Sequence, residues 1–141
     1  LRSPVSPRVA RMSEPTLGIS AVREFTVTDA DTAVALGSGD VPVLATPRVV
    51  AWLEAATVAC LADVLDADRT SVGTRVEIEH LAPSPVGAHV TAAASVSYVD
   101  GRLVRFEVAA EHRVARGDPV LVASGTVTRV LVDRARFLSR L

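Results

Sequence analysis

The chain has 141 residues, a formal net charge of −1 and a hydrophobic share of 49%. This length is enough for one domain that buries a core without disulfides or metals. Charges of both signs are scattered along the chain, which excludes a basic surface for nucleic acid. No stretch of the roughly 18 residues that span a bilayer is predominantly apolar, since the long charge-free run of residues 80–99 is broken by prolines, serines and histidines, so we expect a soluble protein with no nucleic-acid or membrane partner.

The N-terminal residues differ in composition from the rest of the chain. Residues 1–11 are rich in proline and arginine and show no hydrophobic period, and a native start at Met12 would suit the sequence. We expect residues 1–14 to be a disordered extension and residues 15–141 to form one domain.

The chain has a single cysteine, Cys60, which lies in an apolar segment. One cysteine offers no intrachain disulfide and no cysteine-based metal site. The sequence therefore predicts a protein of the reducing cytoplasm that needs no metal and no cofactor.

The first half of the chain predicts a strand, a loop and a long helix. Alternating polar and apolar residues favour a strand over residues 17–28, and the small and polar residues of 29–42 favour a loop. Thr46 and Pro47 predict a helix start, because threonine can cap the first turn and proline at N1 forfeits no hydrogen bond. The helix is expected to run to about Leu65.

The second half of the chain predicts four strands. They cover residues 71–82, 88–99, 102–115 and 119–132, and a short amphipathic tail follows. Asp100 and Gly101, between two alternating runs, predict a tight hairpin. We expect an antiparallel meander, and the element order predicts an α+β domain with a five-stranded antiparallel sheet against one long helix.

The predicted helix is apolar on nearly all sides and contains Trp52, so one sheet face cannot cover it. Either the sheet wraps around the helix or a second subunit covers the rest. Both solutions favour the hotdog fold, in which a curved sheet encloses a central helix and pairs with a neighbour.

Glu54 is the one charged residue between Arg48 and Asp63, and it shares a helical stripe with Val50, Val58 and other apolar residues. A desolvated carboxylate is suited to acid–base chemistry, because burial without a partner is costly. The alternative is a structural carboxylate that meets a hydroxyl or an arginine of the sheet, or that protrudes at the edge of the stripe. The residues alone leave both open.

The chain has three histidines, and strand alternation places two of them toward the core. His80 shares a face with Val76 and Ile78, and His112 shares one with Phe106. Either could be a core histidine with a hydrogen-bond partner or a functional one. His89 begins a strand and is expected to be exposed.

Three stretches carry a family resemblance: "ATPRVVAWLEAA", "TSVGTRVEIEHLAPSPVG" and "VTRVLVDRARFLSRL". Together they resemble the fluoroacetyl-CoA thioesterase-like branch of hotdog thioesterases, and the resemblance covers roughly residues 15–141. It implies that Thr46, Glu54 and His80 form the catalytic set and that Gly73 binds substrate through its backbone. It also implies an acyl-CoA substrate of short to medium length and a homodimer with the site at its interface.

The implied chemistry is thioester hydrolysis, which needs a nucleophile or activated water, an oxyanion donor and an acid for the leaving thiolate. Glu54 would be the nucleophile or the general base, and the sequence leaves both roles open. His80 would move protons, and Thr46 would position the acyl group or the histidine as well as cap the helix. The Gly73 amide would face the oxyanion, unless the glycine merely forms a bulge.

Spacing along the helix limits how one chain can build this site. Eight residues of helix span about 12 Å, too far for Thr46 and Glu54 to touch one acyl carbon. Either the Thr46 turn folds back or a neighbouring subunit completes the set.

Fluoroacetyl-selective members of the branch carry bulky aromatic residues before the threonine, whereas residues 37–45 here contain none. We therefore expect modest selectivity among acyl groups. A non-catalytic acyl- or partner-binding hotdog dimer is the alternative, and a hotdog hydratase is disfavoured because its D-x-N-P-x-H run is missing.

Overall fold

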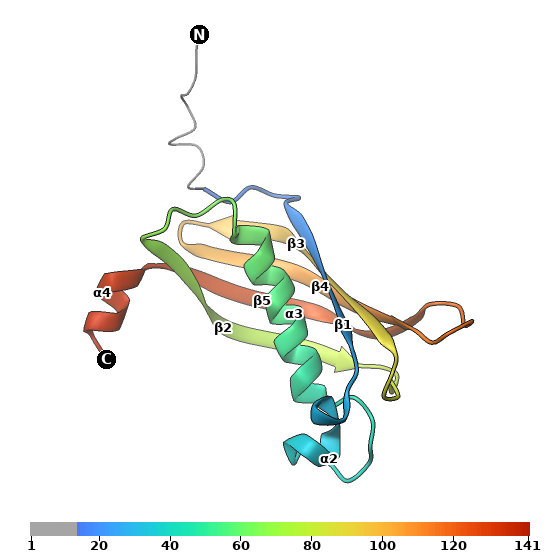
Figure 1. Cartoon of the computed structure of the whole chain (residues 1–141). Helices are drawn as coiled ribbons and strands as arrows, with labels where there is room; N and C mark the ends of the chain where they lie inside the picture. The colour runs from blue at the N-terminus through green and yellow to red at the C-terminus, as the bar shows by residue number, and fades with distance from the viewer. Residues whose placement is uncertain (1–13) are drawn as a thin grey trace.

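The structure is a computed structural model that describes residues 14–141. The predicted extension, residues 1–14, therefore lies outside the described residues except for Glu14. One five-stranded antiparallel sheet dominates the fold (Figure 1). Its strands are β1 (Ser20–Thr26), β2 (Arg69–His80), β3 (His89–Asp100), β4 (Leu103–Arg113) and β5 (Val120–Asp133).

The long helix α3 (Thr46–Leu61) lies across one face of the curved sheet (Figure 1). Between β1 and α3 the chain forms the 3-10 turn η1 (Asp29–Asp31) and the short helix α2 (Ala33–Leu36), and α4 (Arg134–Ser139) follows β5. This confirms the predicted α+β architecture of one helix against a five-stranded antiparallel sheet. In residues 14–141, no helix has the length and apolar character required to cross a membrane.

The core lies between α3 and the concave face of the sheet. Leu53 and Ala56 of α3 are fully buried there, as are Phe106 and Val127 of the sheet. Trp52 stacks on Phe25 of β1 with ring centroids 4.5 Å apart and planes 2° apart. These contacts anchor α3 firmly enough to serve as the base of a site.

One side of α3 has no cover from the sheet. Val58 is 47% exposed in the middle of an otherwise apolar helix. Glu54 lies four residues earlier on the same side, and its side chain is 35% exposed. The sheet therefore wraps only part of the helix, and Glu54 lies at the edge of the apolar stripe, one of the two alternatives that the sequence left open.

The strand order is β1-β3-β4-β5-β2, which corrects the predicted meander. Strands β3, β4 and β5 do follow one another, but β2 pairs with β5 instead of β3. The strand β1 takes the place beside β3. As a result β2, which carries His80, is an edge strand with one free side.

The hairpin between β3 and β4 lies one residue later than the sequence predicts. Asp100 pairs with Leu103, so the two loop residues are Gly101 and Arg102. Gly101 has a φ of 59°, the left-handed conformation that favours glycine at this position.

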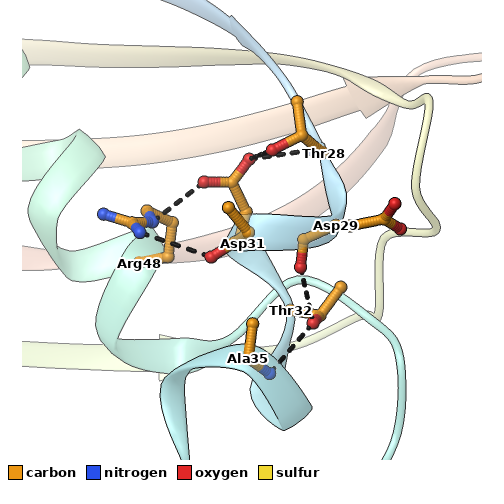
Figure 2. A network of polar contacts seen from close by, with 7 residues as sticks. Thr28, Asp29, Asp31, Thr32, Ala35 and Arg48 are labelled. Atoms are coloured by element: carbon orange, nitrogen blue, oxygen red, sulfur yellow. Dashed lines mark hydrogen bonds and ion pairs between the residues drawn. The ribbon is translucent and has the colours of Figure 1, made fainter.

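The predicted loop before α3 contains short helical elements, and polar contacts join its first residues to α3 (Figure 2). The carboxylate of Asp31 accepts hydrogen bonds from the backbone and hydroxyl of Thr28, at 2.8 and 2.9 Å. It also pairs with Nε of Arg48 on α3 at 2.9 Å. Backbone pairing of Thr32 with Leu44 closes the loop, so residues 33–43 form a flap with a fixed base.

The helix boundaries also differ from the prediction. Helix α3 ends at Leu61, and turn-like hydrogen bonds to the carbonyl of Leu61 carry the chain on to Leu65. Thr46 does not cap the helix. The N-cap is Ala45 and makes no side-chain hydrogen bond, while Thr46 is the first helical residue.

Candidate active site

Thr46 and His80 meet where the start of α3 lies against the end of β2. The Oγ1 atom of Thr46 is 2.8 Å from Nδ1 of His80, so the threonine hydroxyl bonds the histidine instead of the helix amides. Strand alternation alone could not predict this contact, because the contact depends on where α3 crosses the sheet. The bond fixes the orientation of the imidazole ring.

The second ring nitrogen of His80 has no partner. Its Nε2 atom is buried and makes no hydrogen bond within residues 14–141. Burial is the main cause that lowers the pKa of His80, and the Ala82 backbone opposes that shift. A neutral imidazole with one oriented nitrogen and one unused nitrogen is equipped to accept and pass on a proton.

A cavity of about 350 Å³ adjoins this pair. Residues 38–46, which include part of the flap, line one part of the cavity. Residues 80–83, from the end of β2 onward, line another part. Its described lining contains Val41, Val43 and Leu44 but no phenylalanine, tyrosine or tryptophan. The cavity is therefore a slot of moderate size with mainly small and aliphatic residues in its lining, together with Ser38, Asp40, Thr46 and His80.

Glu54 lies in a second cluster, beside Arg129 of β5. Its Oε2 atom is 3.4 Å from Nη1 of Arg129. The guanidinium is held by Ser71 of β2, which accepts from Nε through its hydroxyl at 2.8 Å and from Nη2 through its carbonyl at 3.2 Å. Arg129 is buried, and burial lowers its pKa, an effect that the charge of Glu54 partly opposes. The arrangement places a carboxylate beside a fixed guanidinium at the edge of the core.

Gly73 lies directly under the Glu54 carboxylate. A Cβ atom at position 73 would be 2.5 Å from Oε2 of Glu54 and 3.5 Å from Nη1 of Arg129. The register of β2 against β5 shifts between Gly73 and Arg75, which marks a bulge at this point. A side chain at position 73 would therefore have to displace the Glu54 carboxylate from the β2 backbone.

The structure brings the four predicted residues together in two pairs. Thr46 contacts His80, and Glu54 adjoins Gly73, but no hydrogen bond or ion pair joins the pairs within the described part of the chain. Eight residues of α3, about 12 Å of helix, separate Thr46 from Glu54. The Thr46 turn does not fold back, so one of the two predicted solutions is excluded.

The other two histidines have structural partners. His112 is buried and its Nδ1 atom is 2.6 Å from the hydroxyl of Ser84. His89 is exposed, as predicted, with Nδ1 3.2 Å from Oγ1 of Thr26.

Sequence reasoning allowed for an arginine of the sheet beside Glu54 but did not identify Arg129, and it missed Ser71. A signal for Arg129 exists, since it alternates with the buried Val127 and Leu131 and must therefore point toward the core. A charged side chain at such a position needs a partner, and Glu54 is the acid of the facing helix.

Solved structures of similar fold define the class. The structure of the fluoroacetyl-CoA thioesterase FlK matches with a TM-score of 0.81 and 26% identity, over 91% of this chain and 96% of that one. A thioesterase superfamily member from Thermus thermophilus matches with a TM-score of 0.80 and 28% identity, over 90% of each chain. A hot-dog-like protein from Thermanaerovibrio acidaminovorans matches with a TM-score of 0.77 and 25% identity, over 89% of this chain and 90% of that one. The chain has the hotdog fold of these thioesterases.

The family follows from the sequence itself. The model of the family described as FlK, fluoroacetyl-CoA-specific thioesterase, matches residues 27–135, and this chain belongs to that family. The curated fluoroacetyl-CoA thioesterase of Streptantibioticus cattleyicolor is 32% identical over 95 residues. That match covers 67% of this chain and 65% of the relative.

Proposed function

We propose that this protein hydrolyses the thioester bond of acyl-CoA to a free acid and CoA. The observation that carries the proposal is the 2.8 Å contact of Thr46 with His80 at the adjoining cavity. Membership of the FlK family supports it, as does the similarity to a FlK variant solved with fluoroacetate and CoA, which matches with a TM-score of 0.77 and 27% identity over 86% of this chain and 98% of that one.

A direct test is thiol release from a series of acyl-CoA thioesters, from acetyl to octanoyl. We expect saturable hydrolysis, and Glu54→Gln should lower kcat by about 10²-fold or more. The matched control is Glu111→Gln, an exposed carboxylate on β4. Binding of acyl-CoA without hydrolysis would instead identify a non-catalytic hotdog protein.

In the proposed reaction, the acyl carbon lies between Glu54 and the Thr46–His80 pair. With Glu54 as general base, the carboxylate takes a proton from water while the water oxygen bonds to the acyl carbon. The carbonyl oxygen becomes an oxyanion, and the C–S bond then breaks to release the thiolate. The proton taken by Glu54 reaches the thiolate sulfur through His80, so that acid and thiol leave and the residues return to their starting state.

With Glu54 as nucleophile, its oxygen bonds to the acyl carbon while the C–S bond breaks and the thiolate leaves. Water then cleaves the resulting anhydride to the product acid and the Glu54 carboxylate, and the proton released passes through His80 to the thiolate. Both courses use the Glu54 carboxylate, whose Oε2 atom lies 3.4 Å from Nη1 of Arg129. Turnover in ¹⁸O-labelled water and rapid-quench mass spectrometry together separate them. Label in the Glu54 side chain, or an acylated Glu54 peptide trapped during turnover, identifies the nucleophile. Label in the product acid with no acylated Glu54 peptide identifies the base.

We propose that the site is completed in a homodimer formed along β2. This strand is at the edge of the sheet, and Val76 at its middle is 38% exposed. Antiparallel pairing of two β2 strands, centred between Val76 and Glu77, would set His80 of one subunit opposite Gly73 of the other. The Thr46–His80 pair of one subunit would then face Glu54 of its partner, and the partner would cover the exposed side of α3.

The expected setting is the cytoplasm. Cys60 is a free thiol that is buried in the core, where burial raises its pKa. Such a thiol is unreactive and needs no oxidising compartment.

A further inference from the structure

A cluster of arginines surrounds a cavity at the end of the sheet where β2 begins. The cavity measures about 400 Å³. Figure 1 shows α4 projecting from the end of β5 at this point, beside the start of β2. The lining residues come from the β3–β4 hairpin, the end of β5 and α4, and they are Arg102, Val132, Asp133, Arg136, Phe137 and Arg140.

Three guanidinium groups at this cavity have no partner among residues 14–141. No hydrogen bond, ion pair or ring contact engages the side chains of Arg102, Arg136 and Arg140 within residues 14–141. Most other arginines of the described chain do have partners: acids in the case of Arg48, Arg69, Arg75 and Arg129, and aromatic rings in the case of Arg23 and Arg105.

The single acid of the cavity does not neutralise them. Asp133 caps α4, and its carboxylate accepts from the backbone amide of Arg136 at 2.9 Å. Three cations and one anion leave an excess of positive charge in a protein whose net charge is −1. An anionic ligand is therefore favoured at this place.

The aromatic residue narrows the class of anion. Phe137 is 38% exposed at the same cavity, so its ring is available to a ligand. Guanidinium groups bind phosphate through paired hydrogen bonds, and an aromatic face stacks on a planar base. Phosphate and a planar base together are the chemistry of a nucleotide.

A second cavity is lined by residues that neighbour both the cluster and Glu54. It measures about 240 Å³, and its lining includes Val58, Leu61 and Leu65 from the end of α3 and the residues after it. Ser71, which holds Arg129 beside Glu54, also lines the cavity, as does Arg134 at the start of α4. Asp133 is opposite Arg69 in the sheet, four residues and about 13 Å of strand before Gly73.

We propose that Arg102, Arg136, Arg140 and Phe137 bind the 3′-phosphorylated ADP end of the CoA substrate, with the pantetheine arm along the second cavity. This inference rests on the proposed function and adds the place where the nucleotide binds. The nucleotide is the part of acyl-CoA most remote from the thioester, and the cluster is correspondingly remote from Glu54. The predicted consequence is that the cluster sets affinity for CoA esters without taking part in the chemical step.

The test compares two substrates with the same thioester, acetyl-CoA and acetyl-pantetheine, which lacks the nucleotide. The double variant Arg136→Ala/Arg140→Ala should raise KM for acetyl-CoA about tenfold or more, the loss expected from one or two charged hydrogen bonds, with kcat unchanged. For acetyl-pantetheine both constants should stay within about twofold of the parent. The matched control is Arg116→Ala, an exposed arginine of the β4–β5 loop.

Direct binding gives a second readout that does not depend on turnover. Adenosine 3′,5′-bisphosphate should bind the parent protein in calorimetry and bind the double variant at least about tenfold more weakly. Inorganic phosphate, which lacks the base and the second phosphate, should bind much more weakly than the bisphosphate, and Phe137→Leu should narrow that difference.

Three results would overturn the inference. They are an unchanged KM for acetyl-CoA, equal losses on both substrates, and parent-like binding of the bisphosphate by the double variant. Equal losses accompanied by a change in light-scattering mass would assign α4 to a subunit contact. Failure of the proposed function is a different outcome, because then the parent protein hydrolyses neither thioester.

Discussion

Gly73 and Glu54 occupy adjoining space between β2 and α3, where a Cβ atom on the glycine would lie 2.5 Å from Oε2 of the carboxylate. Gly73→Ala must therefore displace the Glu54 side chain or the strand. We expect kcat to fall by about 10²-fold, because a shift of about 1 Å in a reacting group has an effect of that size. Gly117→Ala, in the β4–β5 loop, should leave kcat unchanged. Parent-like turnover in Gly73→Ala would show that the position of Glu54 is not critical.

The two inward-facing histidines should respond differently to substitution. His80→Ala should abolish most of the hydrolysis and leave the melting temperature close to that of the parent. His112→Ala should keep turnover but lower the free energy of unfolding by about 1–3 kcal/mol, because the buried Ser84 hydroxyl loses its partner. Measurements of kcat and thermal unfolding on both variants decide the assignment, and the reverse pattern would exchange their roles.

Much of the fold could be predicted because its signals are local. Alternation within each strand, the apolar run of α3 and the turn at Gly101 all act over a few residues. The partner of β2 could not be predicted, since it pairs with β5 some 50 residues away along the chain, and periodicity carries no information on that choice. The position of Arg129 against Glu54, 75 residues apart, depends on the same pairing.

The candidate site could likewise be predicted only where its signals are local. Glu54 and His80 stood out because a charged and a titratable residue share otherwise apolar faces, and both positions adjoin a cavity or an ion pair in the structure. The role of Thr46 was mistaken in part, because a threonine before proline is a natural cap and nothing local shows that His80 competes for its hydroxyl.

The stability of the protein should depend on pH through His80. Burial lowers the pKa of His80 below its usual value of 6.5, so the unfolded chain takes up this proton at a higher pH than the folded protein does. Stability is therefore lost as pH falls through the usual value toward the lowered one. Between about pH 7 and pH 5, the parent should lose more free energy of unfolding than His80→Gln does. Parallel curves from denaturant unfolding would contradict the assigned burial of the imidazole.

Selectivity for fluoroacetyl-CoA should be weak. The cavity beside Thr46 and His80 contains no aromatic ring, and its lining is small and aliphatic apart from Ser38 and Asp40. Differences in size alone yield about 1–3 kcal/mol per methylene in an apolar pocket. We expect values of kcat/KM for fluoroacetyl-CoA and acetyl-CoA that differ by much less than about 10³-fold. A larger preference for the fluorinated substrate would show that an aromatic flap is not needed for that selectivity.

The most direct measurement of the central claim, a hydrolytic site shared between two subunits, is complementation between two inactive variants. Glu54→Gln and His80→Ala are each expected to form dimers by light scattering and to be nearly inactive. After mixed refolding, half of the dimers should be mixed, and each should hold one intact site made of Glu54 from one chain and His80 from the other. The account predicts recovery of about a quarter of the parent activity, the fraction of intact sites among all sites in a random dimer mixture. Mixed dimers confirmed by native mass spectrometry but without recovered activity would contradict it.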